Sequence, residues 1–66
     1  MHPLPELREA ARQLGSLRAK CEKAGEKLRP GSAQKTLNAR RIEALQVALA
    51  LIEREMGQVA EGAEAP

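Results

Sequence analysis

The sequence predicts an all-α protein, an antiparallel hairpin of two helices, and three observations support this fold class. In the first half, apolar residues recur at alternating spacings of three and four, which places them on one face of a helix. The segment Arg29-Pro30-Gly31-Ser32 then breaks the pattern, because proline and glycine do not continue a helix. A second helical pattern of similar length follows it. Two matched helices joined by a short connection form an antiparallel hairpin.

The chain is short for a protein that folds alone. Its 66 residues form one small domain, and it has no Phe, Tyr or Trp to supply the largest units of core burial. The single cysteine, Cys21, has no second cysteine with which to form an internal disulfide. A domain of this size hides only about 60% of its unfolded surface. We therefore expect oligomerisation or a partner protein to supply part of the stability.

The first helix is predicted over residues 5–28. Pro5 suits the first helical position, and Glu6 and Glu9 lie in the first turn, where the helix dipole favours negative charge. An interior glycine, Gly15, costs roughly 1 kcal/mol relative to alanine and does not end the helix. The apolar residues that we expect to form the seam of the hairpin are Leu7, Ala10, Leu14, Leu17, Cys21, Ala24 and Leu28. In such a seam a free cysteine acts as a small apolar residue.

The second helix is predicted over residues 32–56, with Ser32 accepting a hydrogen bond from a free amide of its first turn. Its apolar residues form two adjacent stripes. The first stripe is Ile42, Leu45, Leu49, Ile52, Met56 and Val59, and the second is Leu37, Ala44, Ala48 and Leu51. The first helix can cover only one stripe, and the sequence does not tell which. Residues 1–4 and 60–66 are predicted to be disordered ends.

The second helix therefore has more apolar surface than a single hairpin can cover. Between Ala44 and Ile52 the only polar residue is Gln46, a composition that requires burial on more than one side. Two kinds of partner are open at this point. A second copy of the chain would complete a homodimeric four-helix bundle, and a different protein would accept the helix in an apolar groove.

Charge is unevenly distributed along the chain. Residues 27–41, which we call the basic segment, sum to +5 with no acidic residue, and residues 42–66 sum to −4. Lys35, Arg40 and Arg41 are the candidate contacts for nucleic acid, since clustered cations neutralise phosphates. No aromatic residue is present to stack on bases, and the third helix of a helix-turn-helix unit is missing. A homodimeric regulator that binds nucleic acid is thus the alternative hypothesis, and a role in protein docking is favoured.

The residue types of catalysis and metal binding do not converge in this sequence. His2 is the only histidine, and Glu53 and Glu55 are two apart, so they point to different sides of a helix. We expect neither an enzyme nor a cofactor. The start lacks the pattern of a secretory signal, and the longest apolar run is far short of the ~20 residues that span a bilayer. The expected location is the cytoplasm, without a membrane contact.

Part of the chain resembles a known family. The similarity runs from Arg29 to Val59 and centres on Ala33-Gln34-Lys35 and on the segment from Arg41 to Ile52. With the short length and the two matched helices, these residues resemble the small YscE/PscE-type co-chaperones of type III secretion systems. The resemblance implies a cytoplasmic helical hairpin that pairs with a tetratricopeptide-repeat-like chaperone, and the pair keeps the needle subunit soluble before export.

The resemblance also indicates which residues meet the partner. The docking residues that it implies are Leu45, Ala48, Leu49 and Ile52. On the first helix, Leu14, Leu17 and Cys21 are expected to brace them. A needle subunit polymerises through exposed apolar helix surface, so a chaperone complex must offer competing apolar surface that is later released.

Overall fold

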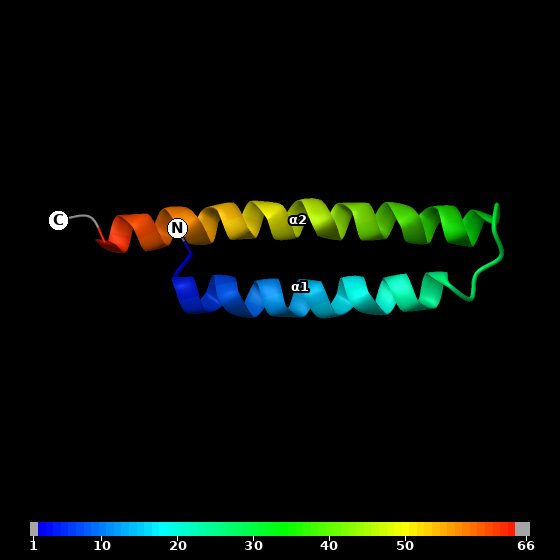
Figure 1. Ribbon diagram of the computed structural model, residues 1–66, viewed down its shortest axis with the longest axis horizontal. Helices are drawn as coiled ribbons and strands as arrows, with labels where there is room; N and C mark the ends of the chain where they lie inside the picture. The colour runs from blue at the N-terminus through cyan, green and yellow to red at the C-terminus, as the bar shows by residue number, and fades with distance from the viewer. Residues whose placement is uncertain (1, 65–66) are drawn as a thin grey trace.

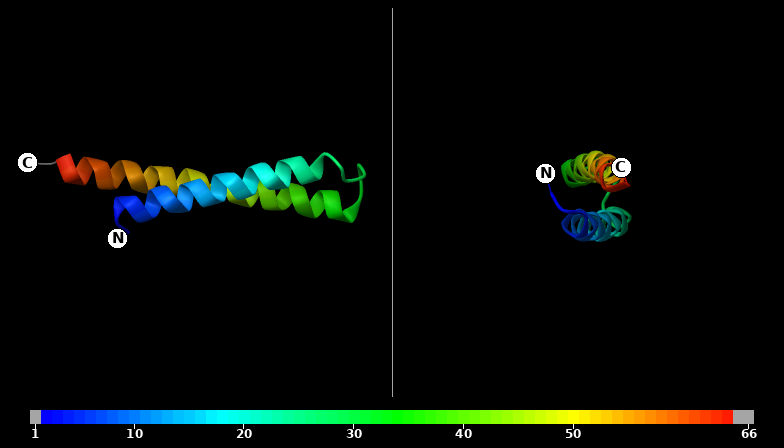
Figure 2. Two further views of the ribbon diagram at one scale, coloured as in Figure 1. Left: turned by 90° about the horizontal axis from the view of Figure 1, so that it is seen from below. Right: turned by 90° about the vertical axis from the view of Figure 1, so that its left-hand side faces the viewer.

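The protein is a hairpin of two antiparallel helices, as predicted. In the computed structural model, which describes residues 2–64, α1 spans Leu4–Gly25 and α2 spans Ala33–Glu64. The helices lie side by side, cross at a shallow angle and give a rod of 54 × 14 × 14 Å (Figures 1 and 2). α2 continues past the start of α1 at the open end of the hairpin, opposite the connection (Figure 1).

The first helix begins and ends with identifiable backbone contacts. Pro3 is the N-cap, and its carbonyl accepts the first hydrogen bond, from the Leu7 amide at 3.1 Å. Pro5 lies in the first turn, where its missing N–H would have had no partner. The α-helix ends at Gly25, three residues before the predicted end at residue 28. The next three amides instead donate to carbonyls three residues back, so the chain tightens into turns.

The connection between the helices, residues 26–32, uses the turn chemistry that the sequence predicts. Gly31 has a φ of 80°, a conformation that glycine adopts without steric cost. Ser32 then caps α2, since its Oγ accepts a hydrogen bond from the Lys35 amide at 3.1 Å. This contact satisfies one of the amides that the first turn leaves without a partner.

The second helix is longer than predicted, because it runs through residue 56 to Glu64. Gly57 does not end it. A lone glycine costs roughly 1 kcal/mol relative to alanine, which a continuing helix tolerates. Among the ends predicted to be disordered, Leu4 and residues 60–64 belong to the helices, and residues 1, 65 and 66 lie outside the described part.

The core of the hairpin is thin. Of the large apolar side chains described, only Leu7 and Leu49 are buried, at 6% and 9% exposed. The other inward residues are half-buried, because two helices alone cannot enclose a side chain on all sides. Neither helix, over the described residues, is long and apolar enough to cross a membrane.

Candidate functional site

The structure shows which apolar stripe of α2 packs against α1. The inward residues are the first stripe, Ile42, Leu45, Leu49, Ile52, Met56 and Val59, all of which are buried or half-buried. This stripe keeps a near-heptad spacing from Ile42 to Val59, as residues in the seam between two helices do. The stripe is therefore used within the hairpin.

This placement bears on the docking residues that the resemblance implied. Leu45, Leu49 and Ile52 belong to the inward stripe, and Ala48 lies half-buried at its edge. Leu49, at 9% exposed, has almost no surface left for another protein. In the folded hairpin these residues face α1, and Leu45, Ala48 and Ile52 stay half-buried, so part of their surface is still open.

The predicted seam of α1 divides in a similar way. Leu7 is buried, and Leu14, Cys21 and Leu28 are half-buried, whereas Leu17 remains 49% exposed. Leu17 therefore lies at the side of α1, at the edge of its contact with α2. A residue that the sequence analysis did not single out, Arg18, is half-buried instead. Its Nε is buried, and the nearest carboxylate oxygen, Glu22 Oε1, is 3.5 Å away.

Three of the four residues of the second stripe of α2, Leu37, Ala44 and Leu51, face outward, whereas Ala48 is half-buried. Leu37 and Leu51 are 47% and 59% exposed, Val47 beside them is 56% exposed, and Ala44 is also exposed. Leu37, Ala44 and Leu51 follow one another at intervals of seven residues, close to two helical turns, so they lie in one line. A row of half-exposed leucines forms an apolar patch on the surface, and such patches mark interaction sites.

An open groove joins this line to α1. Leu17, Cys21, Arg41, Ala44 and Leu45 line the groove, whose volume is about 330 Å³. Because Leu17 and Ala44 both line the groove, Leu17 lies on the same side of the hairpin as the line of Leu37, Ala44 and Leu51. We call this surface, made by Leu17, Leu37, Ala44 and Leu51 with the groove, the apolar face.

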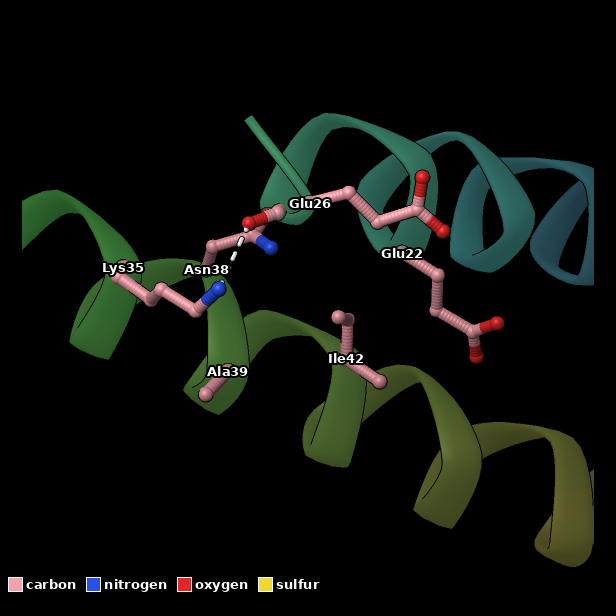
Figure 3. Close-up of a pocket in the computed structure, with 7 residues that line it drawn as sticks. Glu22, Glu26, Lys35, Asn38, Ala39 and Ile42 are labelled. Atoms are coloured by element: carbon pink, nitrogen blue, oxygen red, sulfur yellow. Dashed lines mark hydrogen bonds between the residues drawn. The ribbon is translucent and has the colours of Figure 1, made fainter. Parts of the chain in front are cut away.

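Two hydrogen bonds near the connection join α2 to the end of α1. Lys35 Nζ donates to the Gly25 carbonyl at 2.9 Å (Figure 3), and Asn38 Nδ2 donates to the Cys21 carbonyl at 2.9 Å. A Cβ on Gly25 would lie 2.5 Å from Asn38 Nδ2, so only glycine permits this approach. The two donors from α2 thus bond to carbonyls of the last turn of α1, and the Gly25 carbonyl accepts the Leu28 amide as well, at 3.2 Å.

The contact of Lys35 bears on the three basic residues that are candidate contacts for nucleic acid. Lys35, half-buried, is engaged with the end of α1, whereas Arg40 and Arg41 are exposed. The cavity at the contact, about 260 Å³, is lined by Glu22 and Glu26 as well as Lys35, so it is not a purely cationic site. Asn38 was not singled out from sequence, although a polar residue in line with the inward stripe was a usable signal.

The titratable side chains form local pairs on the surface. Arg12 and Gln13 donate to the Glu9 carboxylate, and these hydrogen bonds, that of Arg12 first, lower the pKa of Glu9 to about 2. Near the start, His2 Nδ1 lies 3.1 Å from Glu6 Oε1. Within residues 2–64, no three side chains of the metal-binding types gather closely enough to hold an ion.

Comparisons of the chain with protein-family models, with curated proteins and with solved structures found no match. Among the features of the described residues, the apolar face and its groove are the ones that suggest a surface for binding a partner.

Proposed function

We propose that this protein is a non-enzymatic adaptor, a co-chaperone that binds a tetratricopeptide-repeat-like chaperone and so helps to keep a type III secretion needle subunit soluble before export. The observation that carries the proposal is the apolar face. It stays half-exposed after the hairpin has formed, with Leu17, Leu37 and Leu51 between 47% and 59% exposed. The resemblance of residues 29–59 to the YscE/PscE-type co-chaperones supports the identity of the partner.

The shape of the hairpin suits this role. Helical-repeat proteins present extended concave surfaces, and an amphipathic helix binds such a surface through residues spaced by about two turns. Leu37, Ala44 and Leu51 have this spacing on an exposed helix face. Burying a half-exposed leucine contributes on the order of 1 kcal/mol, by the coefficient of about 25 cal/mol per Å².

Arg41 adds a polar contact to the same surface. It lines the groove between the helices and is exposed, directly beside Ala44. Arginine is enriched among the residues that dominate protein interfaces, because its guanidinium combines charge with a flat stacking surface. We expect it to orient the partner along the groove.

The test is affinity capture from a cell that carries the cognate type III secretion system, followed by mass spectrometry. The bait is the wild-type chain, the Leu51→Asp variant or the Ala50→Asp variant. Both variants place a charge on exposed helix, but only the first places it on the apolar face. The proposal predicts that wild type and Ala50→Asp recover a repeat chaperone together with a needle subunit, and that Leu51→Asp loses both. Equal recovery by both variants, or no repeat protein with any bait, would contradict it.

A further inference from the structure

We infer that the free protein pairs with a second copy of itself through the apolar face, with the two hairpins antiparallel and a two-fold axis passing beside Ala44. Three independent observations lead to this occupant: the exposed area, the symmetry of the stripe, and the direction of charge along the rod.

The first observation is the exposed area. A compact monomer of 7.2 kDa exposes about 4,100 Å² by the usual scaling with mass. This chain exposes 5258 Å². The excess of roughly 1,100 Å² exceeds the ~800 Å² that each partner buries in a stable complex of standard size. The excess belongs to the elongated rod as a whole, and a second copy lying along the rod through the apolar face would reduce it.

The second observation is the symmetry of the outward stripe. Leu37 and Leu51 lie seven residues on either side of Ala44. When two copies of α2 pair in opposite directions about Ala44, Leu37 of each copy meets Leu51 of the other. The small side chain at the centre lets the two helices approach closely. The stripe is thus complementary to itself, as a two-fold interface requires.

The groove supports the same axis. It places Leu17 of α1 at the same height along the rod as Ala44 of α2. A two-fold rotation about an axis beside Ala44 therefore brings Leu17 of the two copies together as well. The 49% of this side chain that α2 leaves exposed would then be covered by its own counterpart.

The third observation is charge, which sets the direction of the second copy. The basic segment, net +5, lies at the connection end of the rod, whereas residues 42–64, net −4, run towards the open end. Two hairpins with their connections at the same end would bring the basic segments together. With the connections at opposite ends, each basic segment lies against the acidic part of the other copy, which is favourable.

Self-pairing would compete with the binding of the chaperone. The homodimer covers the same face that the proposed function assigns to the chaperone, so one copy cannot use it for both. This consequence rests on the proposed function, whereas the homodimer itself does not. The two are tested separately, because the homodimer is measured on the purified chain and the chaperone by capture.

Crosslinking tests the geometry of the pair. Each variant carries Cys21→Ala and one new cysteine, and the reagent is a short bismaleimide. We expect Ala44→Cys to form a linked dimer by itself. Leu37→Cys should not, since its two copies would lie ~21 Å apart along the helices, but a mixture of Leu37→Cys with Leu51→Cys should form the mixed product. A linked dimer of Leu37→Cys alone, or none of Ala44→Cys, would overturn the geometry.

Sedimentation equilibrium tests the pair itself. Wild type and Ala50→Asp are expected at twice the 7.2 kDa of the chain, and Leu51→Asp at the mass of one chain with its helical circular dichroism retained. Wild type at the monomer mass over the whole concentration range would overturn the inference. So would dissociation of Ala50→Asp to the same extent as Leu51→Asp. If Leu51→Asp unfolds, the crosslinking variants, which introduce no charge, still decide the question.

Discussion

At the scale of single residues, Gly25 and Asn38 decide how closely the two helices approach near the connection. Asn38 Nδ2 reaches the Cys21 carbonyl at 2.9 Å across the space where a Cβ of residue 25 would stand. Gly25 is buried, whereas Gly15 and Gly57 have nothing within 4 Å of their Cβ positions. Glycines at these three helical sites are therefore not equivalent, and among them only Gly25 has a side-chain atom of another residue where a Cβ would stand.

Replacing Gly25 by alanine is expected to lower the free energy of unfolding by about 1–2 kcal/mol, because the new methyl displaces Asn38 from its carbonyl partner. The matched control is Gly15→Ala, which should raise it by about 1 kcal/mol through helix propensity alone. Urea unfolding at one fixed protein concentration measures both. A Gly25→Ala variant as stable as Gly15→Ala would show that Asn38 does not hold the helices together.

Glu9 provides a test of the surface electrostatics. Hydrogen bonds from Arg12 and Gln13 lower the pKa of its carboxyl from 4.5 to about 2. Because the folded pKa is the lower one, the stabilisation is present above about pH 4.5 and is lost as the pH falls towards 2. Carbon-detected NMR titration should give a Glu9 pKa near 2, and Arg12→Gln should raise it. A pKa close to 4.5 in the wild type would contradict the pairing.

At the scale of elements, α2 depends on its cap and on the division of its apolar residues into two stripes. Ser32 supplies the cap, with Oγ 3.1 Å from the Lys35 amide. One stripe then holds α1, while the other remains on the surface with Leu37 and Leu51 about half exposed. The element therefore builds the fold with one face and offers binding surface with the next.

Ser32→Ala is expected to lower the free energy of unfolding by about 1 kcal/mol, since one amide of the first turn of α2 loses its acceptor. Ser16→Ala is the control, because Ser16 is exposed inside α1, where alanine is the better helix former. Thermal unfolding followed by circular dichroism compares the two. Equal effects of the two changes would show that the cap does not stabilise the hairpin.

The sequence predicts much of this architecture, and particular residues show where prediction stops. The spacing of apolar residues and the break at Pro30-Gly31 are sufficient for the two helices and their antiparallel order. Periodicity could not decide which stripe of α2 faces α1, because both stripes have the same chemistry and differ only in angle. Their orientation depends on long-range contacts, such as Lys35 with Gly25, that a local pattern does not contain.

At the scale of the whole molecule, the hairpin is a rod with two unlike sides. One side bears the groove lined by Leu17, Cys21 and Ala44, and the other bears the cavity with Glu22, Glu26 and Lys35. The thin core, in which only Leu7 and Leu49 are buried among the large apolar side chains described, leaves little stability in reserve. Covering the apolar face with another protein molecule adds the burial that two helices lack.

The most direct test of this account measures whether another protein molecule covers the apolar face inside the cell. In a Cys21→Ala background, Leu51→Cys and Ala50→Cys place single thiols on adjacent exposed residues of α2, one on the apolar face and one off it. Cysteine keeps the apolar character of the site. We expect several-fold slower alkylation of Leu51→Cys than of Ala50→Cys in intact cells, with the difference abolished in urea. Equal rates in intact cells would contradict it.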